Sequence, residues 1–163
     1  MEALQRPHFS AHEVEVVESY IGKTISNVVH YYWKNKMDSE GITLLYAVEL
    51  FFDDNDFVVI HTGNTEEDAR IRFSDTDMVS EKIAIENQFN GAITLVGVDV
   101  GKVEPWSIMR GKTIIRMEAD LDKDTQRFFA DYLIFSSKEG EVLLKIGEFG
   151  DGLEVHPFYR DEE

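Results

Sequence analysis

The stretch LLYAVELFFDDNDFVVI (Leu44–Ile60) decides the fold class of this 163-residue chain. It joins two apolar runs through the segment Asp53–Asp56, whose Asp and Asn residues are typical of turns. Aromatic and β-branched residues are frequent in both runs, and such residues favour strands. The first run is apolar on both faces of a strand, so we expect it in the middle of a sheet. The stretch therefore predicts an antiparallel β-hairpin.

A second stretch in the C-terminal half, YLIFSSKEGEVLLKI (Tyr132–Ile146), repeats this order of features. The tetrapeptide GKTI precedes both hairpins, at Gly22–Ile25 and at Gly111–Ile114. The apolar triplets of the two hairpins align in the same order, and the gaps between them fall in polar loops. We predict that an ancestral unit was duplicated. The alternative is that β-meanders resemble one another because strands draw on few residue types.

The predicted repeat covers approximately residues 14–74 and 103–158, and the two copies are expected to share one core as a single domain, 1–163. For the connecting segment 75–102 we predict a hairpin, because it contains an alternating run and an Asn-Gly pair. A helix over Asp77–Asn87 is the alternative. The predicted fold is mainly β (α+β). It consists of antiparallel sheets from two tandem four-strand units in an approximate two-fold relation, with one or two short helices.

The GKT tripeptides do not form phosphate-binding loops. Such a loop needs a further glycine five residues before the Gly of GKT. Val17 and Trp106 occupy those positions. We also expect a helical segment before GKT rather than after it, because Ser10 and Glu13 have capping-box spacing. Each glycine is therefore expected to end a helix or turn and lead the chain into a strand.

Charge and composition limit the partners. The chain has 32 Asp and Glu against 16 Lys and Arg, a formal net charge of −16, and no cysteine. The acid surplus repels nucleic acid and anionic membranes and attracts basic proteins. Without cysteine there are no disulfides or thiolate metal sites. No segment has the pattern of a secretory signal or a membrane span, so we expect a cytoplasmic protein.

No residue pattern identifies a catalytic site, a cofactor or a metal site. Asp120, Asp122 and Asp124 have the alternating spacing of a calcium loop, but Thr125 stands where that loop needs glycine. A solvated acidic turn is the favoured reading, and cation binding is left open. The histidines are expected to be ordinary surface or core residues.

The segment Tyr31–Lys36 offers the most specific candidate site. The first copy is longer than the second here, and the extra length contains Tyr31, Tyr32, Trp33, Lys34 and Lys36. Aromatic residues are enriched at the centres of protein interfaces. We therefore predict that these residues bind a partner. The alternative is a long hairpin in which Tyr31 and Trp33 point into the core.

In composition the chain resembles antitoxin-type immunity proteins of bacteria, which bind a toxic enzyme and block it. The resemblance implies a non-catalytic inhibitor of a basic partner protein. One alternative is a small-ligand-binding protein or enzyme, with a pocket between the two copies lined by carboxylates and His61 or His156. Another is a structural homo-oligomer that pairs through sheet edges.

Overall fold

The computed structural model describes residues 6–36, 43–62, 70–147 and 152–159. Within these ranges, two antiparallel sheets and two α-helices account for most of the chain, which confirms the mainly β (α+β) class. The elements, in chain order, are α1 Ala11–Ser19, β1 Ile25–Asn35, β2 Thr43–Phe52, β3 Phe57–His61, β4 Arg72–Ser74, α2 Met78–Gln88, β5 Ile93–Asp99, the 3₁₀ turn η2 Trp106–Ile108, β6 Arg116–Glu118, β7 Leu121–Asp122, β8 Arg127–Phe128, β9 Tyr132–Ser136, β10 Glu141–Ile146 and β11 Leu153–Phe158.

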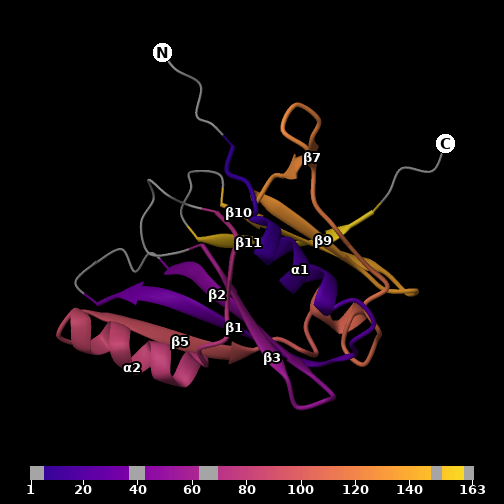
Figure 1. Cartoon of the computed structure of the whole chain (residues 1–163). Coiled ribbons are helices and arrows are strands. Elements are labelled where there is room, and N and C mark those ends of the chain that lie inside the picture. Colours follow the sequence, from indigo (N-terminus) through magenta and orange to yellow (C-terminus); the bar gives the residue numbers. More distant parts are fainter. Residues whose placement is uncertain (1–5, 37–42, 63–69, 148–151, 160–163) are drawn as a thin grey trace.

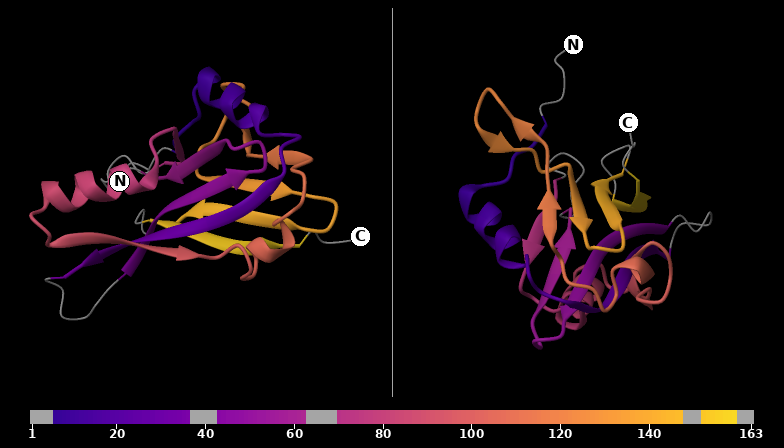
Figure 2. Two further views of the ribbon diagram at one scale, coloured as in Figure 1. Left: turned by 90° about the horizontal axis from the view of Figure 1, so that it is seen from below. Right: turned by 90° about the vertical axis from the view of Figure 1, so that its right-hand side faces the viewer.

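Each sheet is built on a four-strand meander, to which β5 is added beside β1 in the larger sheet, and the two sheets stack on each other. The larger has the order β4–β3–β2–β1–β5 and the smaller β11–β10–β9–β6, and β7 and β8 form a separate two-stranded ribbon. In Figure 2 the orange and yellow strands of the smaller sheet lie against the purple strands of the larger one. As predicted from their apolar faces, β2 and β9 are inner strands.

Alternate residues of the stacked strands form the main core. The pleat directs every second side chain to the facing sheet, and one cluster of buried apolar residues results. From the larger sheet it includes Val28, Val48, Leu50, Val58 and Ile60; from the smaller, Leu133, Phe135, Val142, Leu144 and Leu153. Both halves of the sequence therefore contribute to the same core.

The two GKTI segments pair with each other. Thr24 and Thr113 form an antiparallel bridge, with their hydroxyl oxygens 3.0 Å apart. The flanking hydrogen bonds are reciprocal: the Gly22 N–H donates to Ile114 O at 2.8 Å, and the Gly111 N–H donates to Ile25 O at 2.6 Å. Both glycines have positive φ, +95° and +78°, a conformation that most side chains disfavour. The two copies of the tetrapeptide thus pair where the chain leads into each of the two meanders.

The internal repeat itself remains a prediction. The strand orders agree, since each half has a four-strand meander, and equivalent residues face the core. The hairpin registers differ, however: Leu50 pairs with Val58, whereas Leu133 pairs with Leu144 rather than with Val142, the aligned residue. The parts of the alignment on 63–69 and 148–151 lie outside the described residues.

The predicted hairpin between the copies is wrong, and the helix alternative is correct. The segment forms α2, which lies alongside β5 (Figure 1). Asp77 caps the helix by accepting a hydrogen bond from the Ser80 N–H. The Asn-Gly pair ends the helix instead of turning a hairpin. Asn90 and Gly91 both have positive φ, and the Gly91 N–H donates to Glu86 O at 2.8 Å.

The first predicted helix, α1, begins as its sequence indicates. Ser10 and Glu13 form the complete capping box. Glu13 also accepts from Arg70 at 2.7 Å, which ties α1 to the chain just before β4. Burial acts to raise the pKa of Glu13, but the Ser10 N–H and the Arg70 ion pair together outweigh it, so the pKa is lowered.

Candidate functional site

The five residues predicted to bind a partner lie on both faces of β1. Tyr31, Tyr32, Trp33 and Lys34 belong to the strand, and Lys36 follows it directly. Because successive side chains alternate in a strand, Tyr31 and Trp33 share the face covered by α2, whereas Tyr32 and Lys34 share the opposite face. The structure therefore does not bring the five side chains together. Lys34 and Lys36 are exposed, and the three aromatic residues are half-buried.

Tyr31 and Trp33 help to hold α2 on the sheet. The Trp33 ring centroid lies 5.4 Å from that of Tyr46 and 5.5 Å from that of Phe89, which follows α2. Tyr31 lies across Gly97, where an added Cβ would come within 2.9 Å of the ring. Both aromatic residues pack against a second apolar cluster, between the larger sheet and α2. This arrangement corresponds to the inward-pointing alternative considered for these two residues.

On the opposite face of β1, Tyr32 belongs to a hydrogen-bonded chain. The Trp106 indole N–H donates to His30 Nε2 at 2.7 Å, and His30 Nδ1 lies 3.3 Å from the Tyr32 hydroxyl oxygen. An indole is only a donor, so Nε2 must be the unprotonated nitrogen and Nδ1–H the donor to Tyr32. Burial lowers the pKa of His30 to about 4. His30 is therefore a neutral structural residue at pH 7.

The exposed apolar surface near Tyr32 continues onto β5. Tyr32 pairs with Val96 and His30 with Val98, so these side chains share one face. Val96 and Val98 are 42% and 43% exposed, unlike Leu95, which is fully buried. We call Tyr32, Val96, Gly97 and Val98 the β1–β5 margin. The sequence placed this run within the predicted hairpin 75–102 but did not show it to be a sheet edge, because strand order is a long-range property that local pattern does not contain.

A polar cavity of about 160 Å³ lies on the α2 side of the larger sheet. Its lining residues are Tyr46, Val59, His61, Ser74, Thr76, Met78 and Glu81. The Tyr46 hydroxyl donates to Glu81 at 3.2 Å. Burial, reinforced by Glu81, raises the pKa of Tyr46. Burial, reinforced by the charges of Arg72 and Arg70, lowers the pKa of His61 to about 4. These groups can orient a small polar ligand.

The cavity does not lie between the two halves, where the small-ligand alternative expected it. All its lining residues belong to the first half of the chain. His156 is elsewhere, on β11 of the smaller sheet, where its Nε2 lies 3.0 Å from Glu154. His61 and His156, which the small-ligand alternative placed at one pocket, therefore lie on different sheets.

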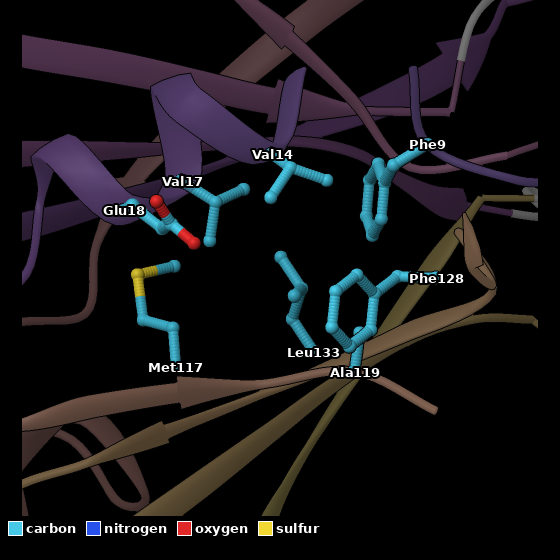
Figure 3. Close-up of a pocket in the computed structure, with 8 residues that line it drawn as sticks. All are labelled: Phe9, Val14, Val17, Glu18, Met117, Ala119, Phe128 and Leu133. Atoms are coloured by element: carbon cyan, nitrogen blue, oxygen red, sulfur yellow. The ribbon is translucent and has the colours of Figure 1, made fainter. Parts of the chain in front are cut away.

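A pocket that does lie between the halves is apolar. It separates α1 from the smaller sheet, has a volume of about 70 Å³, and is drawn in Figure 3. Phe9, Val17 and Leu133 point into it, and the carboxylate of Glu18 stands at one side. With one ionisable side chain in its lining, this pocket has no acid–base pair.

The acidic turn around Asp120–Asp124 is held by the N-terminal segment. Arg6 contacts Asp120 at 3.0 Å and Asp131 at 2.7 Å, and His8 Nε2 lies 2.8 Å from Asp122. The Arg6 guanidinium also stacks 3.7 Å above the Phe129 ring. Among the described residues, no group of three or more histidine or acidic side chains is arranged to hold a metal ion.

No protein-family model, curated protein or solved structure matches the chain. Among the described residues, no helix has both the length and the apolar character needed to cross a membrane.

Proposed function

We propose that this chain is a non-catalytic protein-binding module for a basic partner protein. The net charge of −16 is the observation that carries the proposal. A field of this sign raises the local concentration of basic proteins and speeds their association. Following the compositional resemblance to immunity proteins, the proposed partner is a basic enzyme that the module blocks.

The local environment of several carboxylates supports this proposal. The Lys23 ammonium lies 2.8 Å from both Asp54 and Asp56, and this hydrogen bonding lowers the pKa of each. The Gly101 N–H and the Asn27 amide lower the pKa of Asp99. Because these groups resist protonation, the negative field persists well below neutral pH.

The β1–β5 margin supplies an exposed apolar contact surface. Long-range charge gives rate and orientation, whereas affinity depends on buried apolar contacts. Val96 and Val98 expose such surface on an edge strand, beside the half-buried ring of Tyr32. Lys34, an exposed residue of the predicted binding segment, follows Tyr32 by two positions on β1 and pairs with Thr94, and the exposed Lys36 comes directly after the strand.

Affinity capture from native cell extract, carried out at low and at high salt, tests the proposal. We expect a basic protein to be retained at low salt, and its association rate with the purified chain to fall by about tenfold or more as salt is raised. If the immobilised chain retains no protein from the extract at either salt concentration, the proposal is contradicted. A salt-independent association rate contradicts the electrostatic part of it.

A small-ligand-binding protein or enzyme is the second candidate, favoured by the polar cavity. Tyr46, His61 and Glu81 converge there, and two of them have shifted pKa values. Thermal-shift screening of small polar metabolites tests this candidate, with His61→Ala as the matched variant. A ligand of the cavity stabilises the wild-type chain and not the variant.

A further inference from the structure

One half of β5 leaves its backbone open to solvent. β5 ends the larger sheet, and among the described residues its backbone bonds to β1 alone in that sheet. Ile93 and Leu95 are buried in the cluster beneath α2, so this half of the strand is covered. Residues Val96–Asp99 are exposed throughout. The open edge is therefore this four-residue segment.

The alternation of hydrogen bonds identifies the backbone groups that point outward. The Lys36 N–H donates to Ala92 O at 2.8 Å, and the Val100 N–H donates to Val28 O at 3.0 Å. Residues of an antiparallel pair bond to the partner strand at every second position. The even-numbered residues of β5 therefore bond to β1. Gly97 and Asp99 direct their N–H and C=O groups away from the sheet.

The other sheet edges are protected in ways that proteins commonly use. β4 and β6 are three residues long. β11 contains Pro157, which has no N–H to donate. In the open half of β5 there is no proline, and no charged side chain before Asp99.

The side chains around the open edge indicate the chemistry of its occupant. Val96 and Val98 present apolar surface on one face, and on the other face Gly97 has no side chain to obstruct a neighbouring strand. Asp99 lies at one end of the edge, near Lys102 and Arg110. At the other end Glu86 accepts a hydrogen bond from the Thr94 hydroxyl, and Lys34 pairs with Thr94 across the strands. The chain as a whole has a net charge of −16, which favours a basic occupant. Such a site fits an extended segment with alternating apolar side chains and basic ends.

We infer that the open edge of β5 binds an extended segment of a basic protein by strand addition. The segment's backbone bonds to Gly97 and Asp99, its apolar side chains cover Val96 and Val98, and a basic side chain reaches Asp99. This inference rests on the proposed function and names its contact surface. A second copy of this chain is the wrong occupant, because each copy carries a net charge of −16 and two such copies repel each other.

Amide hydrogen exchange measured by NMR tests the inference directly. The probe is a short synthetic peptide of alternating valine and threonine with a lysine at each end. At a peptide concentration of about ten times its Kd, exchange at Gly97 and Asp99 slows about tenfold, because only the free fraction of the protein exchanges. Exchange at Val96 and Val98 changes little, since these amides already donate to β1.

Two double variants locate the binding. Val96→Lys with Val98→Lys adds positive charge beside the edge and is expected to weaken peptide binding by at least about tenfold. Val79→Lys with Ile83→Lys adds the same charge on α2, where both side chains are exposed, 66% and 56%, and is expected to change the Kd less than about twofold.

Several results overturn the inference. These are an absence of peptide binding at about 1 mM, binding without protection of Gly97 and Asp99, equal effects of the two double variants, and a concentration-dependent dimer that the Val96→Lys/Val98→Lys variant abolishes. If affinity capture still recovers a basic partner that binds this variant as well as wild type, the strand-addition inference fails while the proposed function stands. If wild type captures nothing, the proposed function itself fails.

Discussion

Protonation of His30 should make the fold sensitive to mild acid. The Trp106 indole needs an unprotonated Nε2, and burial lowers the pKa of His30 from 6.5 to about 4. Between these values the unfolded chain binds a proton that the folded chain does not. The contribution to stability is therefore complete above pH 6.5 and is lost as the pH falls toward 4. From pH 7 to pH 5 the loss is about 2 kcal/mol.

Urea unfolding at pH 7 and pH 5 measures this loss. For wild type and for His30→Gln, the free energy of unfolding at pH 5 is subtracted from that at pH 7. Because each protein is compared with itself, a change in the variant's baseline stability cancels. Glutamine retains an acceptor for the indole and does not titrate. We expect the loss of unfolding free energy to be about 2 kcal/mol smaller in His30→Gln than in wild type. Equal losses in wild type and His30→Gln would refute the reasoning.

Three further substitutions test individual contacts. Trp106→Phe removes the indole N–H that donates to His30 Nε2 and should lower the free energy of unfolding by about 1–3 kcal/mol in urea titrations; an unchanged value would mean that the bond contributes nothing. Arg6→Ala breaks ion pairs whose side chains are 29–46% exposed, so thermal melts should show a loss below about 1 kcal/mol; a loss of several kcal/mol would contradict this. Gly152→Ala places a Cβ 2.7 Å from a carbonyl oxygen at φ +74°, whereas Gly22→Ala, at φ +95°, meets no atom within 4 Å. Gly22→Ala should lower the free energy of unfolding by about 1–2 kcal/mol, and Gly152→Ala should lower it clearly more, as measured by urea unfolding. Equal losses would contradict the close contact at Gly152.

Local pattern was sufficient for most strands. The apolar runs Leu44–Phe52 and Tyr132–Phe135 contain too few polar residues for a surface strand, and both became inner strands. The capping box at Ser10 was also readable, because both of its hydrogen bonds are local.

The helix α2 shows where local pattern fails. The run Lys82–Glu86 alternates like a strand, and Asn90-Gly91 is typical of a hairpin turn. The stronger signal was Asp77, because Asp is a good N-cap. An Asn-Gly pair also ends a helix well, since both residues adopt positive φ readily, as they do here. The same short segment fits both the two-residue period of a strand and the 3.6-residue period of a helix. The packing of Met78 and Ile85 on the larger sheet favours the helix.

The candidate site depended on contacts between distant residues. The alternation of Tyr31 and Trp33 was visible, but not that α2 would cover them. Nor could sequence show that the two GKTI segments meet, since Thr24 and Thr113 are 89 positions apart. The open edge of β5 followed only once the strand order was known.

The dissociation constant of the captured partner tests the proposed docking surface most directly. Isothermal titration calorimetry on wild type, the Val96→Lys/Val98→Lys variant and the Val79→Lys/Ile83→Lys variant gives three values under one buffer. We expect the first variant to bind at least about tenfold more weakly than wild type, and the second to remain within about twofold. Indistinguishable dissociation constants for all three proteins would contradict docking at the β1–β5 margin.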